Sequence, residues 1–364
     1  MLGEPTVVGN ASSMTSRMKL ALTFIVAVCA LTSAASNQAR AFDGCSIKPA
    51  SQLTVNVKAK GAKGDGKADD TAAVQRAIDE VAGTGGTVYV PDGIYLISAT
   101  DPNRLRLGSK MTLRLADRAT LKVIPNNAQQ YSVLMISQAS DVTVVGGMLQ
   151  GDRKEHQGKK GEWGMGIFIG PEVERVTIAG VTSKEMWGDG FYVSGATDIA
   201  FCSVVANHNR RQGLSIIAAN RLLVTNSVFR DTRGTRPSAG TDIEPDQSNE
   251  LVTNVRIESS KFIDNAGGGI IIAGKKGEVA HVEILRNVFE GGRPILVENA
   301  PRVRSTAICH NRHTVKETPP TEGFNAFAEE VEVVALQTDC NNGRDLRFQV
   351  TRQTKKKKKP KPVN

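Results

Sequence analysis

The sequence predicts an all-β solenoid, a parallel β-helix formed by a single chain, and two sets of internal repeats support this prediction. The first set places five apolar strand residues at steps of 23, 23, 33 and 27 residues: Ile178, Phe201, Val224, Ile257 and Ile284. The second set lies between them at steps of 24, 23, 29 and 27 residues: Gly166, Gly190, Gly213, Asp242 and Gly269. Two short β-segments in about 23 residues cannot close a core alone, so each repeat must stack on its neighbours.

Steps longer than 23 residues indicate loops inserted into a coil, and such insertions tend to lie on one binding face. They occur at residues 233–241 and 275–280, and a larger one runs from Gly151 to Trp163. We therefore expect the binding face beside these insertions.

A short helix is predicted before the first repeats. Asp70 is expected to cap its N-terminus, and Val74, Ile78 and Val81 form one apolar stripe at helical spacing. This helix is expected to cover the open N-terminal end of the core. The glycine-rich G-A-K-G-D-G before it is not a phosphate-binding loop, because no G-K-[ST] follows.

The chain divides into four predicted regions. Residues 1–41 form a signal peptide region, with Arg17 and Lys19 before an apolar stretch and cleavage expected after Ala41, so we expect a secreted or periplasmic protein. Residues 42–311 form the β-helix, 312–354 a C-terminal cap or extension, and 355–364 a disordered, lysine-rich tail. The apolar stretch is too short to span a bilayer, so no transmembrane segment is predicted.

The formal net charge of +9 is unevenly distributed. Two of these charges lie in the signal region and six in the last ten residues, which leaves about +1 for residues 42–354. A near-neutral body argues against a dedicated nucleic-acid binder. The tail from Lys355 to Lys361 is expected to make at most a weak contact with anionic surfaces. The oligomeric state is not predicted.

Four cysteines remain after cleavage, and an exported chain permits disulfides. Cys309 and Cys340 are the preferred pair because both lie outside the repeats, whereas Cys202 is expected to be a packed thiol. No Cys/His spacing indicates zinc.

Carboxylates gather in the segment T-D-I-E-P-D. Asp242, Glu244 and Asp246 alternate with Ile243 and Pro245, so all three would share the outer face of a continuing strand, about 7 Å apart. Three like charges this close raise the pKa of at least one, as a general acid requires. Two other interpretations stay open: a Ca²⁺ site formed by the same three side chains, and a solvated acidic turn.

Asp189 in W-G-D-G-F-Y-V is a further acid–base candidate. It lies two coils before the acidic segment, about 10 Å from Asp242 or Glu244, a separation closer to that of inverting than of retaining glycosidases. The alternative is a turn aspartate between two glycines.

Aromatic and basic residues recur at the same places in the repeats. Trp163 and Trp187 are 24 residues apart and offer flat faces for sugar rings, and Arg210 or Arg211 could hold a uronate carboxylate. The other interpretation is an aromatic ladder that covers the coil edge. Strand alternation places five residues of the second repeat inward, Ile167, Phe191, Leu214, Ile243 and Ile270. The outward set is Phe168, Tyr192, Ser215, Glu244 and Ile271, with Tyr192 a further candidate for substrate contact.

Residues 61–80 and 85–97, which include G-A-K-G-D-G-K-A-D-D-T and G-G-T-V-Y-V-P-D-G-I-Y-L-I, resemble the N-terminal segment of pectate-lyase-like right-handed β-helix proteins. This superfamily includes glycoside hydrolase family 28 and the alginate epimerases, and the resemblance implies a right-handed coil with an N-terminal capping helix. W-G-D-G-F-Y-V resembles the N-T-D motif of family 28, which carries the catalytic role to Asp189. Arg211 and Gln212 stand where that family has paired aspartates, and its histidine is missing. G-T-D-I-E-P-D resembles the D-P-H-E strand of alginate epimerases through Asp242, again without the histidine.

These observations predict an exported, polysaccharide-active protein. The first expectation is a glycoside hydrolase that acts on a uronate-containing polysaccharide with Asp189, Asp242, Glu244 and Asp246 as acid–base candidates. The alternatives are a polysaccharide lyase or C5-epimerase, and a non-catalytic glycan-binding β-helix. Hydrolysis would require no cofactor, whereas a lyase could use Ca²⁺.

Overall fold

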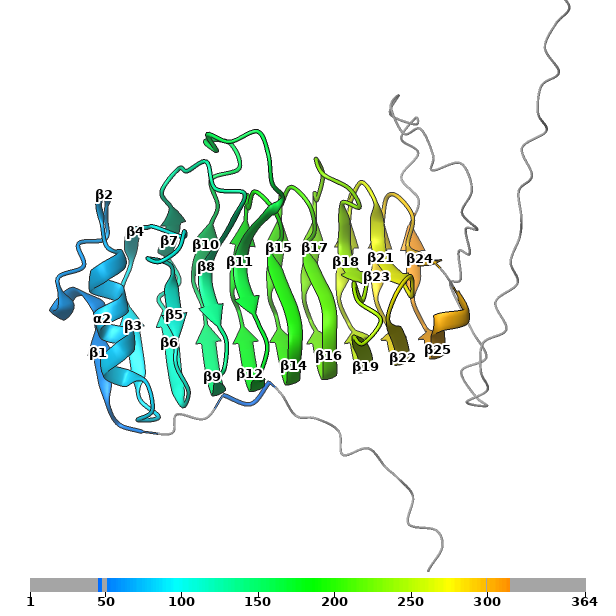
Figure 1. Ribbon diagram of the computed structural model, residues 1–364, viewed down its shortest axis with the longest axis horizontal. Coiled ribbons are helices and arrows are strands. Elements are labelled where there is room, and N and C mark those ends of the chain that lie inside the picture. The colour runs from blue at the N-terminus through cyan, green and yellow to red at the C-terminus, as the bar shows by residue number, and fades with distance from the viewer. Residues whose placement is uncertain (1–44, 48–50, 299, 315–364) are drawn as a thin grey trace, which may run out of the picture. The chain divides into compact units, whose positions relative to one another are not determined.

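A computed structural model describes residues 45–47, 51–298 and 300–314. Within these ranges, short parallel strands stack into a solenoid (Figure 1). The predicted signal region, the lysine-rich tail and all but the first three residues of the 312–354 extension lie outside the described residues. No helix in the described ranges is long and apolar enough to cross a membrane.

One wall of the solenoid is a sheet of short strands. Within the described residues it has 10 strands, paired in chain order with parallel register. They are β2 (Asp65–Asp69), β4 (Gly93–Ile97), β7 (Ala119–Val123), β10 (Met148–Gln150), β13 (Thr182–Lys184), β15 (Val205–Asn207), β17 (Val228–Arg230), β20 (Lys261–Ile263), β23 (Val288–Glu290) and β26 (Arg312–Thr314). Strand β26 extends the solenoid three residues past the predicted boundary at 311.

The other two walls belong to one sheet, which has 16 strands among the described residues. Strands β14 (Phe191–Cys202) and β16 (Leu214–Thr225) are long enough to bend from one wall into the other. The wall that continues their first halves contains β5 (Leu105–Leu107), β8 (Gln130–Ile136), β11 (Trp163–Ile169), β18 (Ala239–Ile243), β21 (Gly268–Ala273) and β24 (Ile295–Glu298). The wall that continues their second halves contains β1 (Thr54–Asn56), β3 (Thr87–Val90), β6 (Met111–Leu115), β9 (Ser140–Val145), β12 (Val173–Ala179), β19 (Leu251–Glu258), β22 (Glu278–Leu285) and β25 (Val303–Cys309).

Alternate strand residues fill the space between the walls, as the period of two requires. All five residues predicted to point inward, Ile167, Phe191, Leu214, Ile243 and Ile270, are fully buried in one continuous core. In the wall of short strands Phe229, Phe262 and Phe289 stack on one another, with ring centroids 5.2 and 5.0 Å apart. The core therefore consists of columns of like residues, one from each coil.

The register of the second repeat differs from the prediction at one coil. Leu214 pairs with Thr241 and Ser215 with Asp242, so Gly240 is the equivalent of Gly213, and Asp242 is not. A Cβ on Gly213 would lie 2.4 Å from the carbonyl oxygen of Gly240, which explains why this position is glycine. The shift of two residues keeps Ile243 inward, but Asp242 replaces Glu244 in the outward row.

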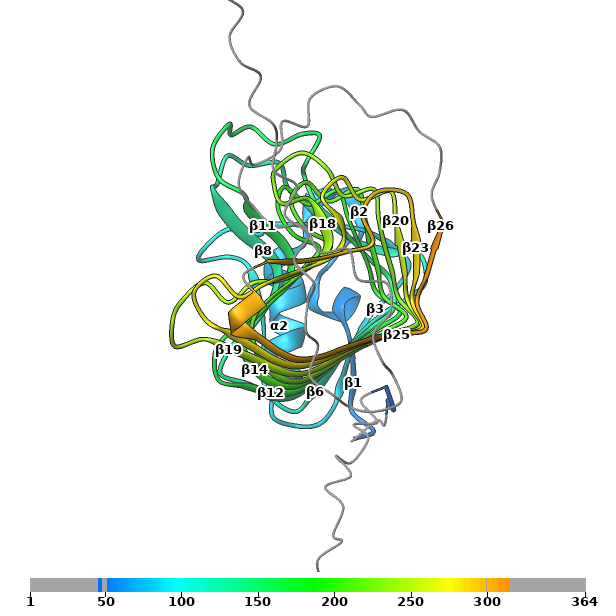
Figure 2. The ribbon, with the colours of Figure 1, turned by 90° about the vertical axis from the view of Figure 1, so that its right-hand side faces the viewer.

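Helix α2 (Thr71–Val81) lies at the predicted position, with Val74, Ile78 and Val81 buried against β1, β3, β4 and β5. In Figure 2, which faces the opposite end, it is seen through the coils. Two 3₁₀ turns are also present, η1 (Val57–Lys60) and η2 (Ala300–Arg302). The prediction that the Asp70 side chain caps α2 is wrong. Asp70 instead accepts the backbone N–H groups of Lys63 and Gly64, and the Asp69 carboxylate accepts that of Thr71.

The cysteine prediction is wrong for Cys202, which forms a disulfide with Cys45. Strand alternation sends Phe201 into the core and Cys202 to the outer surface, where it lies in a small cluster with Ala179 and Ala200. A segment that precedes the first coil is thereby fastened to the outside of β14. Cys309 is also disulfide-bonded, and its expected partner Cys340 lies outside the described residues.

Candidate functional site

One row of outward side chains runs along the wall that contains β18, and we call it the outer ladder. Its members occupy equivalent positions on successive strands: Arg106, Met135, Phe168, Tyr192, Ser215, Asp242, Ile271 and Leu296. Phe168, Tyr192, Ser215 and Ile271 are members as predicted, whereas Glu244 is not. The ladder places a carboxyl group between a hydroxyl and an aliphatic side chain.

Asp189 forms a buried ion pair immediately beside this ladder. Its side chain is fully withdrawn from solvent, and its Oδ2 accepts hydrogen bonds from Nη1 of Arg211 over 3.0 Å and from the Ser215 hydroxyl over 2.9 Å. Burial raises the pKa of Asp189 to about 6, and the Arg211 charge opposes that rise. The sequence named Asp189 and Arg211 separately, and the structure brings them into contact.

Asp242 is held two coils after Asp189. Its Oδ2 accepts a hydrogen bond from the side-chain nitrogen of Gln212 over 2.6 Å, and the carbonyl oxygen of the same amide accepts the Ala239 backbone N–H over 2.7 Å. Asp242 is 1% exposed. Burial, followed by repulsion from Glu244, raises the pKa of Asp242 well above its ordinary value.

The other two predicted carboxylates do not share this row, because β18 ends at Ile243. Glu244 pairs with Lys275 over 3.5 Å, and Lys275 also pairs with Glu298 over 3.2 Å. Asp246 lies exposed in the following turn, where its backbone N–H donates to Glu250. Partial desolvation by the surrounding chain and the negative charge of Glu244 raise the pKa of Asp246.

The predicted Ca²⁺ ligands do not fit a calcium site. Asp242 is buried and bound by an amide donor, Glu244 faces an ammonium group, and Asp246 has left the strand. No group of three or more acidic, His or Cys side chains within the described ranges could hold a metal ion. We therefore derive no step through a cation at these residues.

The two tryptophans occupy different environments. Trp163 begins β11 and is 41% exposed, whereas the Trp187 ring packs against the His156 ring at 4.1 Å and under the Arg210 guanidinium at 3.8 Å. Arg210 also donates to the carbonyl oxygens of Gly161 and Trp187. Trp163 is thus an accessible ring face, while Trp187 and Arg210 are engaged with the protein.

The insertion between Gly151 and Trp163 is held in place by Asp152, which was not among the predicted site residues. Asp152 is buried and accepts hydrogen bonds from Asn126, from the Tyr131 hydroxyl over 2.6 Å and from Nδ1 of His156 over 2.8 Å. The neighbouring Arg153 donates to backbone carbonyls of residues 208, 209 and 233. An aspartate and a histidine four residues apart inside a long insertion were the available signal.

Tyr192 lies half-buried between the aromatic and acidic parts of the ladder. Its ring stacks on Phe168 with centroids 5.6 Å apart. Burial and the negative charges of Asp189 and Asp246 raise the pKa of its hydroxyl above the ordinary value. The hydroxyl therefore stays protonated at neutral pH and can donate a hydrogen bond.

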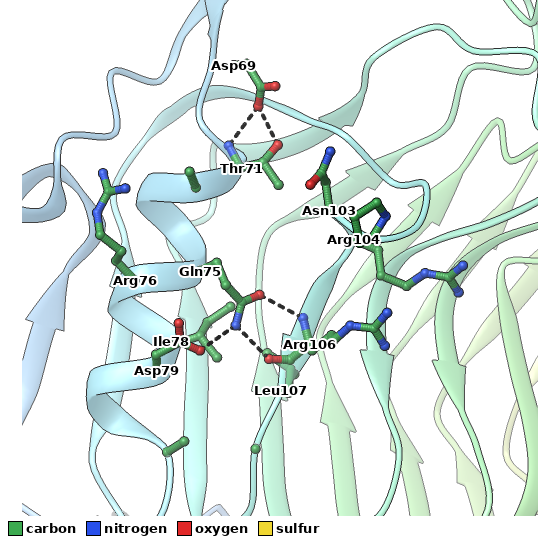
Figure 3. A pocket seen from close by; sticks show the side chains of 14 residues that line it. Asp69, Thr71, Gln75, Arg76, Ile78, Asp79, Asn103, Arg104, Arg106 and Leu107 are labelled. Carbon is green, nitrogen blue, oxygen red and sulfur yellow. Dashed lines mark hydrogen bonds between the residues drawn. The ribbon is translucent and has the colours of Figure 1, made fainter.

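A pocket of about 850 Å³ lies between α2 and β5, at the start of the outer ladder (Figure 3). Gln75 of α2 spans its wall: its amide nitrogen donates to the carbonyl oxygen of Arg106 over 3.1 Å, and its oxygen accepts the Arg106 N–H over 2.9 Å. None of the predicted site residues lines this pocket, but Arg106 belongs to both the pocket and the ladder.

Comparisons with known proteins agree with the fold. A family model described as rhamnogalacturonase A/epimerase, pectate lyase-like, matches residues 54–104. The uncharacterized protein YclG of Bacillus subtilis (strain 168) is 27% identical over 304 residues, 71% of this chain and 52% of that protein. Mannuronan C5-epimerase AlgE6 of Azotobacter vinelandii is 36% identical over 174 residues, which cover 44% of this chain and 20% of the epimerase. The chain thus spans about half of YclG and a fifth of AlgE6.

The A-module of the mannuronan C-5 epimerase AlgE4 from Azotobacter vinelandii has the same fold. It superposes with a TM-score of 0.52 at 21% identity, covering 72% of this chain and 88% of the module. The resemblance to pectate-lyase-like right-handed β-helix proteins is confirmed.

Proposed function

From the pectate-lyase-like fold of this chain, we propose that the solenoid acts on a uronate-containing polysaccharide by proton transfer at C5 of a uronate, as in epimerisation or elimination. The polymer lies along the outer ladder. The observation that carries this proposal is the connected polar network in which Asp189, Arg211 and Ser215 adjoin Gln212 and Asp242.

Such a network is costly for a structural solenoid. Withdrawing an ion from water has an effective penalty of several kcal/mol, which ion pairing only partly offsets. Further along the same row the outward positions are apolar, at Ile271 and Leu296. Buried groups with shifted pKa values gather where proton transfer is needed, so we assign the network to chemistry and not to stability.

The proposed roles follow from what the reaction requires. Removal of the C5 proton needs a base, and the resulting negative charge on the uronate needs a cation or hydrogen-bond donor. Asp242 and Asp189 are the proton-exchanging groups in this proposal, Arg211 supplies positive charge, and the Tyr192 hydroxyl donates. The local identity with mannuronan C5-epimerases supports a uronate substrate.

Hydrolysis is the second candidate, and a specific observation favours it. Asp189 and Asp242 are two buried carboxyl groups with raised pKa values, two coils apart along the same wall. A carboxyl that stays protonated near neutral pH can act as the general acid of a glycosidase while a second carboxylate acts as base.

One set of assays separates these reactions. The protein is incubated with mannuronan and with polygalacturonate. Altered C5 configuration by proton NMR indicates epimerisation, absorbance near 235 nm indicates elimination, and new reducing ends without that absorbance indicate hydrolysis. Asp242→Asn and Asp189→Asn should each abolish turnover, while Arg256→Gln, at an exposed ion pair on another wall, should not. Binding without turnover would establish the glycan-binding alternative, and neither binding nor turnover would overturn the proposal.

Export of this chain is part of the same proposal. The Cys45–Cys202 disulfide supports an oxidising compartment, and the signal-like residues 1–41 support cleavage after Ala41. Expression in a host with a secretory pathway, followed by N-terminal sequencing, should give a mature chain that begins at Phe42. An intact N-terminus in the cytoplasmic fraction would contradict it.

A further inference from the structure

The side-chain amide of Gln212 contacts both the backbone of Ala239 and the carboxyl group of Asp242. Its side-chain oxygen accepts the Ala239 N–H over 2.7 Å. A backbone N–H can only donate, so the atom that faces it must be the amide oxygen. The orientation of this amide is therefore fixed, and its NH₂ group must point at Asp242.

The second contact of Gln212 then determines the hydrogen-bonding state of one carboxyl oxygen. The NH₂ group lies 2.6 Å from Oδ2 of Asp242, and it can only donate. The carbonyl oxygen of a protonated carboxyl is a better acceptor than its hydroxyl oxygen. Oδ2 is therefore the carbonyl oxygen whenever Asp242 is protonated.

The other carboxyl oxygen of Asp242, Oδ1, is not hydrogen-bonded to Gln212. Oδ1 is buried and has no hydrogen-bond partner among the described residues. We propose that Gln212 is a positioning residue, which keeps Oδ2 as an acceptor and confines the exchangeable proton of Asp242 to Oδ1. The inference rests on the proposed function for its role in proton transfer, but the position of the proton can be measured without substrate.

Four charged residues act on Asp242, and a test of Gln212 must leave all four in place. Glu244, Asp189 and Glu298 favour its neutral form, and Arg211 favours its anion. The Gln212 donor also favours the anion, because a hydrogen bond to a carboxylate stabilises the charged form. Removing the donor should therefore raise the pKa of Asp242 further, by about one to two pH units.

Infrared spectroscopy of protein labelled with ¹³C at the aspartate carboxyl carbon tests the inference. The band of protonated Asp242 is assigned by its absence in Asp242→Asn. In Gln212→Ala the carbonyl band should move to higher frequency, because Oδ2 no longer accepts a hydrogen bond, and the pH at which the band disappears should rise. Gln212→Met keeps the length of the side chain and removes the NH₂ group without adding a charge, so it should raise that pH as well and decides the matter if Gln212→Ala does not fold.

Gln150→Ala is the matched control, because the Gln150 amide donates to the Glu185 carboxylate over 3.2 Å on another wall. It should leave the Asp242 band unchanged. An unchanged band and titration in the folded Gln212 variants would overturn the inference whatever the activity. A shifted band in a protein that turns over no polysaccharide would support the inference and overturn only the proposed function.

Discussion

Arg211 and Asp189 form an ion pair in which neither partner is well solvated. Nη1 of Arg211 lies 3.0 Å from Oδ2 of Asp189, and their side chains are 13% and 0% exposed. Burial lowers the pKa of Arg211, but the negative charges of Asp189 and Asp242 outweigh this effect and raise it. The guanidinium therefore stays charged at any relevant pH. The pair therefore makes the stability of the solenoid depend on residues that we assign to chemistry.

Removal of Arg211 should be strongly destabilising. Arg211→Met leaves Asp189 buried without its cation, and breaking a buried pair in this way costs about 3–5 kcal/mol of unfolding free energy. The control is Arg256→Met, which breaks an exposed pair with Glu283 and should cost less than about 1 kcal/mol. Urea denaturation at pH 7.5 measures both. Equal losses in the two variants would mean that the Asp189 pair behaves as an ordinary surface ion pair.

Asp189 should also give the stability a specific pH dependence. Its pKa in the folded protein is about 6, above the ordinary aspartate value of 3.8, so the folded state binds more protons between these pH values. The stabilisation from Asp189 is complete below about pH 4 and is lost as the pH rises through 6.

Asp189→Asn removes this titration while Asp242 keeps its own. The unfolding free energy of the wild type, relative to the variant, should fall by about 2 kcal/mol between pH 4 and pH 7.5. Chemical denaturation at five pH values in this range measures the difference. A difference that is constant or rises with pH would show that burial does not dominate at Asp189.

Trp163 and Trp187 should separate binding from stability. Trp163→Ala removes an exposed ring and should change the unfolding free energy by less than about 0.5 kcal/mol while it weakens polysaccharide binding. Trp187→Ala removes the ring that packs against His156 and Arg210, which should cost about 3 kcal/mol. Calorimetric titration with oligomannuronate and thermal unfolding test the two effects. Loss of stability in Trp163→Ala with unchanged binding would reverse the assignment.

Much of the fold was predictable because its signals are local and repeated. Strand alternation placed Ile167, Phe191 and Leu214 in the core correctly, and the helical stripe of Val74, Ile78 and Val81 located α2. The register failed at the coil after the 233–241 insertion, where spacing no longer identifies equivalent positions. The motif Gly-x-x-Ile in G-T-D-I would have aligned Gly240 with Gly213.

Candidate site residues could be selected from the sequence, but their contacts could not be predicted. Asp189, Asp242 and Arg211 were selected because their residue types and coil positions suggest chemistry. The hydrogen-bond and ion-pair partners of these residues depend on the direction of each side chain at the turns. That direction cannot be deduced from the spacing of residues in the sequence. The role of Gln212 depends on hydrogen bonds to two residues that lie 27 and 30 positions away along the chain. The role of Asp152 depends likewise on partners 21 and 26 positions away.

The disulfide between Cys45 and Cys202 should contribute substantially to stability. It joins residues 157 positions apart, and closing a loop of this size restricts the unfolded chain by up to about 4–5 kcal/mol in the chain-entropy description. We expect Cys45→Ser to lower the unfolding free energy by about 2–4 kcal/mol in the oxidised protein. Cys202→Ser should cause a similar loss, and the double variant should lose little more than either single one, because all three lack the same bond. Urea denaturation of the four proteins, with and without reductant, tests this. If Cys202 were a packed thiol, as the sequence suggested, Cys45→Ser would have no effect and the two losses would add.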